Sequence, residues 1–107
     1  MNKIIFQETS EAYFKDPEKY MSQRSHQSII QDMPEMHFVG MFNNISIYHC
    51  EGITLRVYEE EQYLHSCEKR RLECRTIGLE VEAYGDNEKS IDAVAQKLQE
   101  AIKSNRK

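Results

Sequence analysis

Histidine and cysteine are the residues of this sequence whose chemistry is easiest to recognise. His49 and Cys50 are adjacent, His65 and Cys67 are separated by one residue, and Cys74 follows. Imidazole and thiolate groups bind zinc and related metals, and a cysteine near a histidine can act as a nucleophile. Strong zinc motifs have paired short spacings such as CxxC or HxxxH, which this sequence does not contain. We therefore expect no metal site and no cofactor, with cysteines that pack as small hydrophobic residues.

Carboxylates are the second group of residues that could do chemistry. Glu80 and Glu82 share one face of a predicted strand, and residues 59–61 are three consecutive glutamates. Acid–base catalysis needs a cleft and a raised carboxyl pKa, whereas alternating glutamates are typical of a solvated sheet face. The four glycines are isolated, so the sequence has no phosphate-binding loop. We therefore expect a protein that is not an enzyme.

The main basic cluster is Lys69-Arg70-Arg71, with Tyr63 nearby. It could contact RNA, but three charges usually mark a solvated turn. The net charge of −4 and the pI near 5.6 also disfavour a surface that follows nucleic-acid phosphates. A nucleic-acid-associated regulator therefore stays an alternative function. A small metal or thiol protein that uses the histidines and cysteines is the other alternative.

Aromatic residues, arginine and glutamates between positions 48 and 61 predict an interaction surface, because Tyr and Arg are enriched at protein interfaces. The candidate binding residues are Tyr48, Arg56, Tyr58, Glu59, Glu60 and Glu61. We expect a small non-enzymatic interaction module, such as an inhibitor, immunity protein, adaptor or chaperone-like binder, that uses a mixed aromatic and acidic sheet face. The partner would be a protein, and the acidic composition favours a basic one; edge strands would also allow a homodimer. In the alternative, the first helix or the segment after the meander covers this face.

Length and composition bound the class of protein. A chain of 107 residues predicts one domain, residues 1–107, with a core of moderate size. The charged fraction of 30% and the mean hydropathy of −0.74 indicate a polar surface, and no apolar run approaches a membrane span. The odd count of three cysteines and an N-terminus without a secretory pattern predict reduced thiols and a cytoplasmic location.

Residues 36–58 organise the predicted sheet, because they read as a meander of three antiparallel strands. Asn43-Asn44 is typical of a two-residue hairpin loop, which pairs Phe42 with Ile45, Gly40 with Ile47 and Phe38 with His49. For the second loop, a two-residue Glu51-Gly52 turn would mix polar and apolar residues on each face. A three-residue loop at 50–52, with Gly52 as a bulge, instead pairs Ile47 with Leu55, Ile45 with Val57 and His49 with Ile53. We expect the second arrangement because it collects one apolar face: Phe38, Phe42, Ile45, Ile47, Ile53, Leu55 and Val57.

The remaining elements flank this meander. Residues 1–8 fit a short strand or an arm, residues 9–14 a helical turn, and residues 17–32 a helix whose polar middle either misses the core or becomes a loop. Residues 59–73 favour a helix or turn, with an extended strand pair as the alternative. Residues 76–84 alternate as a strand, and the apolar stripe after residue 86 predicts a C-terminal helix. The expected fold is α+β: an antiparallel sheet of about four strands with an N-terminal and a C-terminal helix packed on it.

Overall fold

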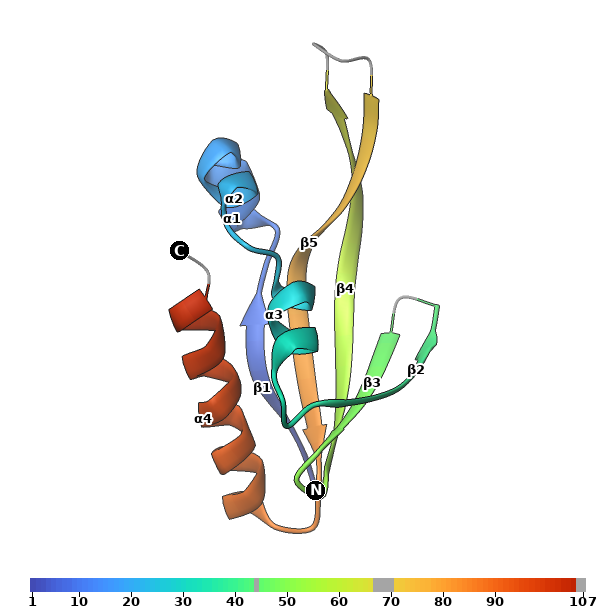
Figure 1. The fold of residues 1–107 in the computed structure, drawn as a ribbon, viewed down its shortest axis with the longest axis vertical. Coiled ribbons are helices and arrows are strands. Elements are labelled where there is room, and N and C mark those ends of the chain that lie inside the picture. Colours follow the sequence, from blue (N-terminus) through green and yellow to red (C-terminus); the bar gives the residue numbers. More distant parts are fainter. Residues whose placement is uncertain (44, 67–70, 106–107) are drawn as a thin grey trace.

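Five strands form one antiparallel sheet in the order β1-β5-β4-β3-β2 (Figure 1). The computed structural model describes the backbone of residues 1–43, 45–66 and 71–105, and the side chains of these residues except 60–66 and 71–77. The strands are β1 (Asn2–Glu8), β2 (His37–Phe42), β3 (Ile45–Cys50), β4 (Ile53–Ser66) and β5 (Arg71–Tyr84). The helices are α1 (Glu11–Lys15), α2 (Pro17–Ser22), α3 (His26–Asp32) and α4 (Glu88–Asn105). The predicted α+β fold with a small antiparallel sheet is confirmed, with one strand more than expected.

The N-terminal helical region divides where its sequence is most polar. α2 begins at Asp16, whose side chain accepts a hydrogen bond of 3.1 Å from the Lys19 amide, and Pro17 occupies the first helical position. A second cap at Ser25, which accepts from the Ser28 amide at 3.3 Å, starts α3. Polar side chains add no burial to hold the helix together, so the chain uses two capped helices instead of one. Of the two alternatives left open for residues 17–32, the structure shows the one in which the polar middle is a loop.

The first hairpin has the predicted register next to its loop and an irregularity further along β2. Phe42 pairs with Ile45 and Gly40 with Ile47, as expected. The register then shifts by one residue at Val39, so that His37 instead of Phe38 lies opposite His49. The predicted Phe38–His49 pair was wrong because a β-bulge, which hairpin loop length does not reveal, inserts one extra residue into β2.

The second hairpin differs from the predicted one in both loop length and register. β3 and β4 are joined by the two-residue Glu51-Gly52 turn, whose φ angles are 50° and 83°. Ile47 therefore pairs with Arg56 and Ser46 with Val57, and the expected pairs with a three-residue loop were wrong. A slip of one residue moves a whole strand to the other face. The predicted continuous apolar face is consequently divided between the two sides of the sheet.

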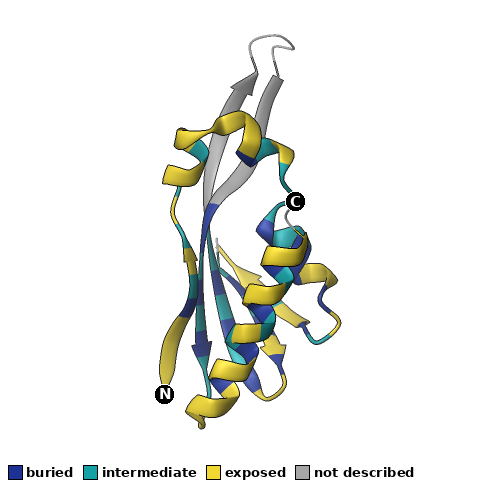
Figure 2. Ribbon diagram, turned by 90° about the vertical axis from the view of Figure 1, so that its left-hand side faces the viewer, coloured by how far each residue is buried: buried dark blue, intermediate teal, exposed yellow. Residues whose placement is uncertain are grey.

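One face of the sheet packs against α3 and α4, and we call it the inner face. Its buried strand residues are Ile5, Ser46, Tyr48, Cys50, Ile53, Leu55, Val57, Leu79, Val81 and Ala83. α3 contributes Ile29 and Ile30 to the same core. α4 contributes the stripe predicted for the C-terminal helix: Ile91, Val94, Leu98 and Ile102. In the part of the chain that the structure describes, α3 and α4 lie on this side and leave the opposite, outer face uncovered (Figure 2).

β4 and β5 include the described residues of the segment 59–73, for which the sequence left helix and strand open. Both strands have 14 residues, and their pairing continues to Ser66 opposite Arg71. The expected helix in residues 59–73 was wrong and the strand alternative is confirmed, because pairing with β5 outweighs the helix propensity of the glutamates. The turn that joins the two strands in this alternative lies mostly outside the described residues. Within the described residues, no helix is long and apolar enough to cross a membrane.

Candidate functional site

The outer face is built from cross-strand neighbours on all five strands. Opposite residues of an antiparallel pair share one face, so the registers define rows across the sheet. The three rows of the outer face are Asn2–Tyr84–Thr54–His49–His37, Ile4–Glu82–Arg56–Ile47–Gly40 and Gln7–Glu80–Tyr58–Ile45–Phe42. The rows mix aromatic, aliphatic and charged residues, a composition typical of a surface that binds rather than of a fully solvated one.

Arg56 is held between two tyrosines at the centre of this face. Its guanidinium carbon lies 5.3 Å from the ring centroid of Tyr58 and 5.8 Å from that of Tyr84. One guanidinium nitrogen also donates a hydrogen bond of 3.1 Å to the Tyr84 hydroxyl. Cation–π contacts and this hydrogen bond restrict the three side chains, and such restraint lowers the entropy that a surface loses in binding. We call these three residues the Tyr–Arg–Tyr cluster.

The edge strand β2 exposes large apolar side chains next to this cluster. Four large apolar residues of β2 are more than half exposed: Phe38 at 57%, Val39 at 54%, Met41 at 54% and Phe42 at 66%. Phe42 continues the row of Tyr58 on the outer face, whereas Phe38 contacts the Tyr48 ring on the inner side at 5.4 Å between centroids. We call these four residues the β2 apolar strip. Phe38 and Met41 pair with the inner-face residues Tyr48 and Ser46, so the strip reaches both sides of this sheet edge. Exposed large apolar side chains gathered on one strand are characteristic of interaction sites.

The structure separates the binding residues that the sequence suggested. Arg56 and Tyr58 lie together on the outer face, as expected. Tyr48 is only 3% exposed and lies on the inner face, where burial and the nearby Glu59 carboxylate raise the pKa of its phenol against a hydrogen bond with Gln31 that lowers it. Glu59 shares that inner side, since it pairs with buried Leu79. The side chains of Glu60 and Glu61 are outside the described part of the chain.

Several residues of the outer face were not predicted as surface residues. Phe42, Ile45 and Ile47 were expected in the core, and the pair Glu80 and Glu82 was read as an ordinary solvated face. The two-residue turn chemistry of Glu51-Gly52 was the signal that could have placed the isoleucines beside Arg56.

The histidines and cysteines of the alternative metal or thiol protein do not assemble among the described residues. Cys50 is fully buried on the inner face, where burial first and Glu51 second raise the pKa of its thiol. His49 is exposed on the opposite face, so these neighbours in sequence cannot share a ligand. Cys67 and the side chains of His65 and Cys74 are outside the description. No cluster of three possible metal ligands occurs in the residues that remain.

A histidine–carboxylate pair joins β1 to α3. His26 Nε2 lies 3.0 Å from Glu8 Oε2, and the Phe6 ring packs on the imidazole with 5.5 Å between centroids. His26 is only 5% exposed, so a substrate could not reach its ring without movement of the chain. This geometry favours a structural tie between the end of a strand and the start of a helix.

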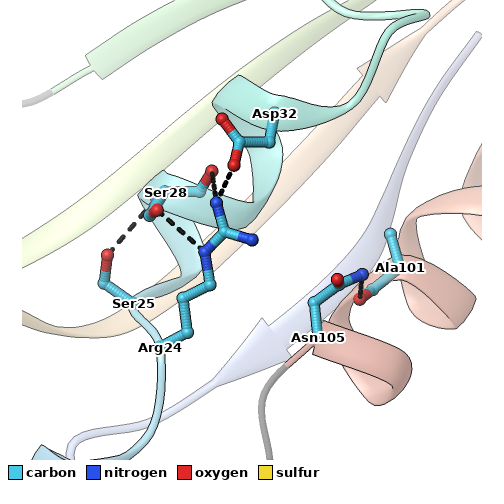
Figure 3. A network of polar contacts seen from close by, with 6 residues as sticks. All are labelled: Arg24, Ser25, Ser28, Asp32, Ala101 and Asn105. Carbon is cyan, nitrogen blue, oxygen red and sulfur yellow. Dashed lines mark hydrogen bonds and ion pairs between the residues drawn. The ribbon is translucent and has the colours of Figure 1, made fainter.

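A cavity of about 370 Å³ lies between α3 and the end of α4. Two of its charged residues, Arg24 and Asp32, bind each other, because Arg24 donates to the Asp32 carboxylate (Figure 3). Arg24 also donates to the Ser28 hydroxyl at 2.9 Å and to the Ser28 carbonyl at 3.2 Å. Asn105 across the cavity donates to the Ala101 carbonyl at 2.8 Å. The Arg24 contacts hold the loop before α3 against that helix, and together with the Asn105 contact inside α4 they favour a structural role for the cavity wall.

No family model, no curated protein and no solved structure matches this chain. Among the described residues, the outer face and the β2 apolar strip are the surface whose composition best suits binding.

Proposed function

We propose that this chain is a small non-enzymatic protein-interaction module that binds another protein through the outer face and the adjoining β2 apolar strip. The observation that carries the proposal is the exposure of four large apolar residues on one edge strand, beside a sheet face that α3 and α4 leave uncovered. An inhibitor, immunity protein, adaptor or chaperone-like binder would use such a surface.

The two parts of the surface suit different parts of an interface. Interfaces commonly bury an apolar centre with aromatic and arginine anchors inside a polar rim. The β2 apolar strip supplies apolar area, and the Tyr–Arg–Tyr cluster supplies restrained anchors. Glu80 and Glu82 lie at the β5 side of the cluster, where they would form part of the rim.

The carboxylates also indicate the kind of protein that would bind. Glu82 lies opposite Arg56, and Glu80 lies opposite Tyr58, so the β5 side of the face carries negative charge that Arg56 offsets only in part. Together with the net charge of −4, this favours a partner with basic residues around an apolar centre. The odd cysteine count supports a reducing, cytoplasmic setting for this function.

The test begins with capture of partners from native host extract and continues with purified components. A single stoichiometric protein should bind, and Tyr58→Ala and Phe42→Ala should each weaken its affinity by at least about fivefold, the effect expected of an anchor residue worth about 1 kcal/mol. Circular dichroism should show that both variants keep the fold, because both side chains lie outside the core.

Phe14→Ala is the matched control for Phe42→Ala. Phe14 is 62% exposed, close to the exposure of Phe42, but it lies on α1. The proposal requires the Phe14 variant to bind like the parent chain. Equal losses in both phenylalanine variants, or no loss in either outer-face variant, would reject the outer face as the binding surface.

A further inference from the structure

Two histidines face each other at one end of the outer face. His37 begins β2 and pairs with His49 of β3, and both residues are exposed. Directly opposite residues of an antiparallel pair have Cα atoms about 4.5–5.5 Å apart and side chains on the same face. The two imidazoles are therefore within reach of a single ion.

The β-bulge at Val39 is what brings the two histidines together. From Phe42 to Gly40 the register follows the hairpin loop, and continued without a bulge it would place His37 opposite Cys50 and Phe38 opposite His49. The extra residue shifts the pairing by one, so both imidazoles share the outer face. Bulges occur often beside functional sites, where they redirect a side chain.

The surroundings leave the imidazole nitrogens available for a ligand. Among the described residues, no hydrogen bond or ion pair engages either His37 or His49. Their row continues to Thr54 and Tyr84, which carry no charge at neutral pH. Arg56, one row away, donates to Tyr84 on β5, so its guanidinium is directed to the side of β4 opposite β3.

We propose that His37 and His49 form a two-histidine binding site for a transition-metal ion, with water at the remaining coordination positions. Neutral imidazole suits zinc, copper and nickel, whereas magnesium and calcium prefer oxygen ligands. The site lies at the β2 end of the row that also holds Tyr84, and its metal binding does not depend on the proposed protein interface. Copper(II) should bind more tightly than nickel or zinc, following the general affinity order of these metals.

The decisive experiment is a zinc titration of the complete chain with ¹⁵N-labelled histidine, observed by NMR under reducing conditions. Zinc is preferred to copper because it does not oxidise the thiols. The ring nitrogens of His37 and His49 should shift together and saturate at one ion per chain. Magnesium at the same concentration should leave both signals in place.

Substitutions separate a shared site from independent binding. Loss of even an outer-shell partner lowers metal affinity by about 10–100-fold, so His37→Gln or His49→Gln should lower zinc affinity at least about tenfold and remove the shift of the other histidine. His65→Gln is the matched control, and it should leave the His37 and His49 response unchanged. Shifts in only one of the two rings, or a response centred on His65, would overturn the proposal.

Discussion

Burial determines the chemistry of Cys50 more than its neighbours in sequence do. The side chain is fully buried on the inner face, and burial holds the pKa of the thiol above its ordinary value of 9.0. The neutral thiol is therefore the form that the folded state prefers. A histidine beside it in the sequence suggested reactivity, but alternation along a strand sends the two side chains to opposite faces.

The raised pKa of Cys50 predicts a loss of stability in alkali. Because the folded pKa lies above the unfolded one, this contribution is fully present below pH 9 and is lost as the pH rises through the folded pKa. The free energy of unfolding should fall above about pH 9, by at most about 1.4 kcal/mol per pH unit from this one group. Urea titrations between pH 7 and 10.5, with reductant present, would measure it.

Cys50→Ala tests whether the Cys50 thiol causes this loss, through the slope of the free energy of unfolding against pH. Its free energy of unfolding should fall less steeply above pH 9, whatever its stability at neutral pH. Tyr48→Phe is the companion variant, because the pKa of Tyr48 is also raised, above 10.0, mainly by burial. Its curve should flatten only at higher pH. Parallel curves for Cys50→Ala and the parent chain would exclude Cys50 as the cause.

At the scale of elements, the turn at Glu51-Gly52 sets the register between β3 and β4. Gly52 has a φ of 83°, and a Cβ built on it meets nothing within 4 Å. Gly52→Ala should therefore destabilise through the backbone alone, by about 1–2 kcal/mol. Thermal or urea unfolding would measure the loss, and Gly52→Asn should show a smaller one because asparagine tolerates this conformation better.

Gly40→Ala is the matched control for this turn. Gly40 lies in β2, has no positive φ, and its added Cβ would meet only Phe42 Cε2 at 3.8 Å, an ordinary contact. We expect a change within about 0.5 kcal/mol. If both alanine variants lost the same stability, positive φ at Gly52 would not explain the effect.

Helices were predictable from local signals such as caps and apolar stripes, whereas the pairing register of the strands was not. The Asp16 cap and the apolar stripe of α4 determine their helices directly. β3, in contrast, alternates isoleucines with Ser46, Tyr48 and Cys50, so either face could be buried. Which face of β3 is buried depends on the side of the sheet that α3 and α4 cover. The hydrophobic pattern of β3 alone does not specify that side.

The same limit explains how much of the candidate site could be predicted. Arg56 and Tyr58 were found because they lie two apart on one strand. Tyr84 joins them only through the pairing of β4 with β5, and His37 meets His49 only through the bulge at Val39. Contacts between strands depend on registers that a single residue can shift, whereas contacts within a strand do not.

At the scale of the whole molecule, the two ends of the chain are joined in one core. β1 lies beside β5, and α4 contacts β1 through the hydrogen bond of 3.1 Å from Gln99 to the Ile5 carbonyl and the ion pair of 2.9 Å between Lys3 and Asp92. Buried residues of β1, α3, β3, β4, β5 and α4 belong to a single cluster. An element from either end therefore cannot leave without exposing the core of the others.

This arrangement predicts one cooperative unfolding transition. Helix loss followed by far-ultraviolet circular dichroism should coincide with the near-ultraviolet signal of the tyrosines, which includes buried Tyr48. For 107 residues the enthalpy at the midpoint should be about 75 kcal/mol, from about 0.7 kcal/mol per residue.

Leu98→Ala, at a fully buried position of α4, should lower stability by about 2–5 kcal/mol and move both signals together. Exposed Lys103→Ala should change stability by no more than about 0.5 kcal/mol. Separate midpoints for the two signals in Leu98→Ala would show that α4 unfolds independently, and that the sheet can hold the outer face in place without it.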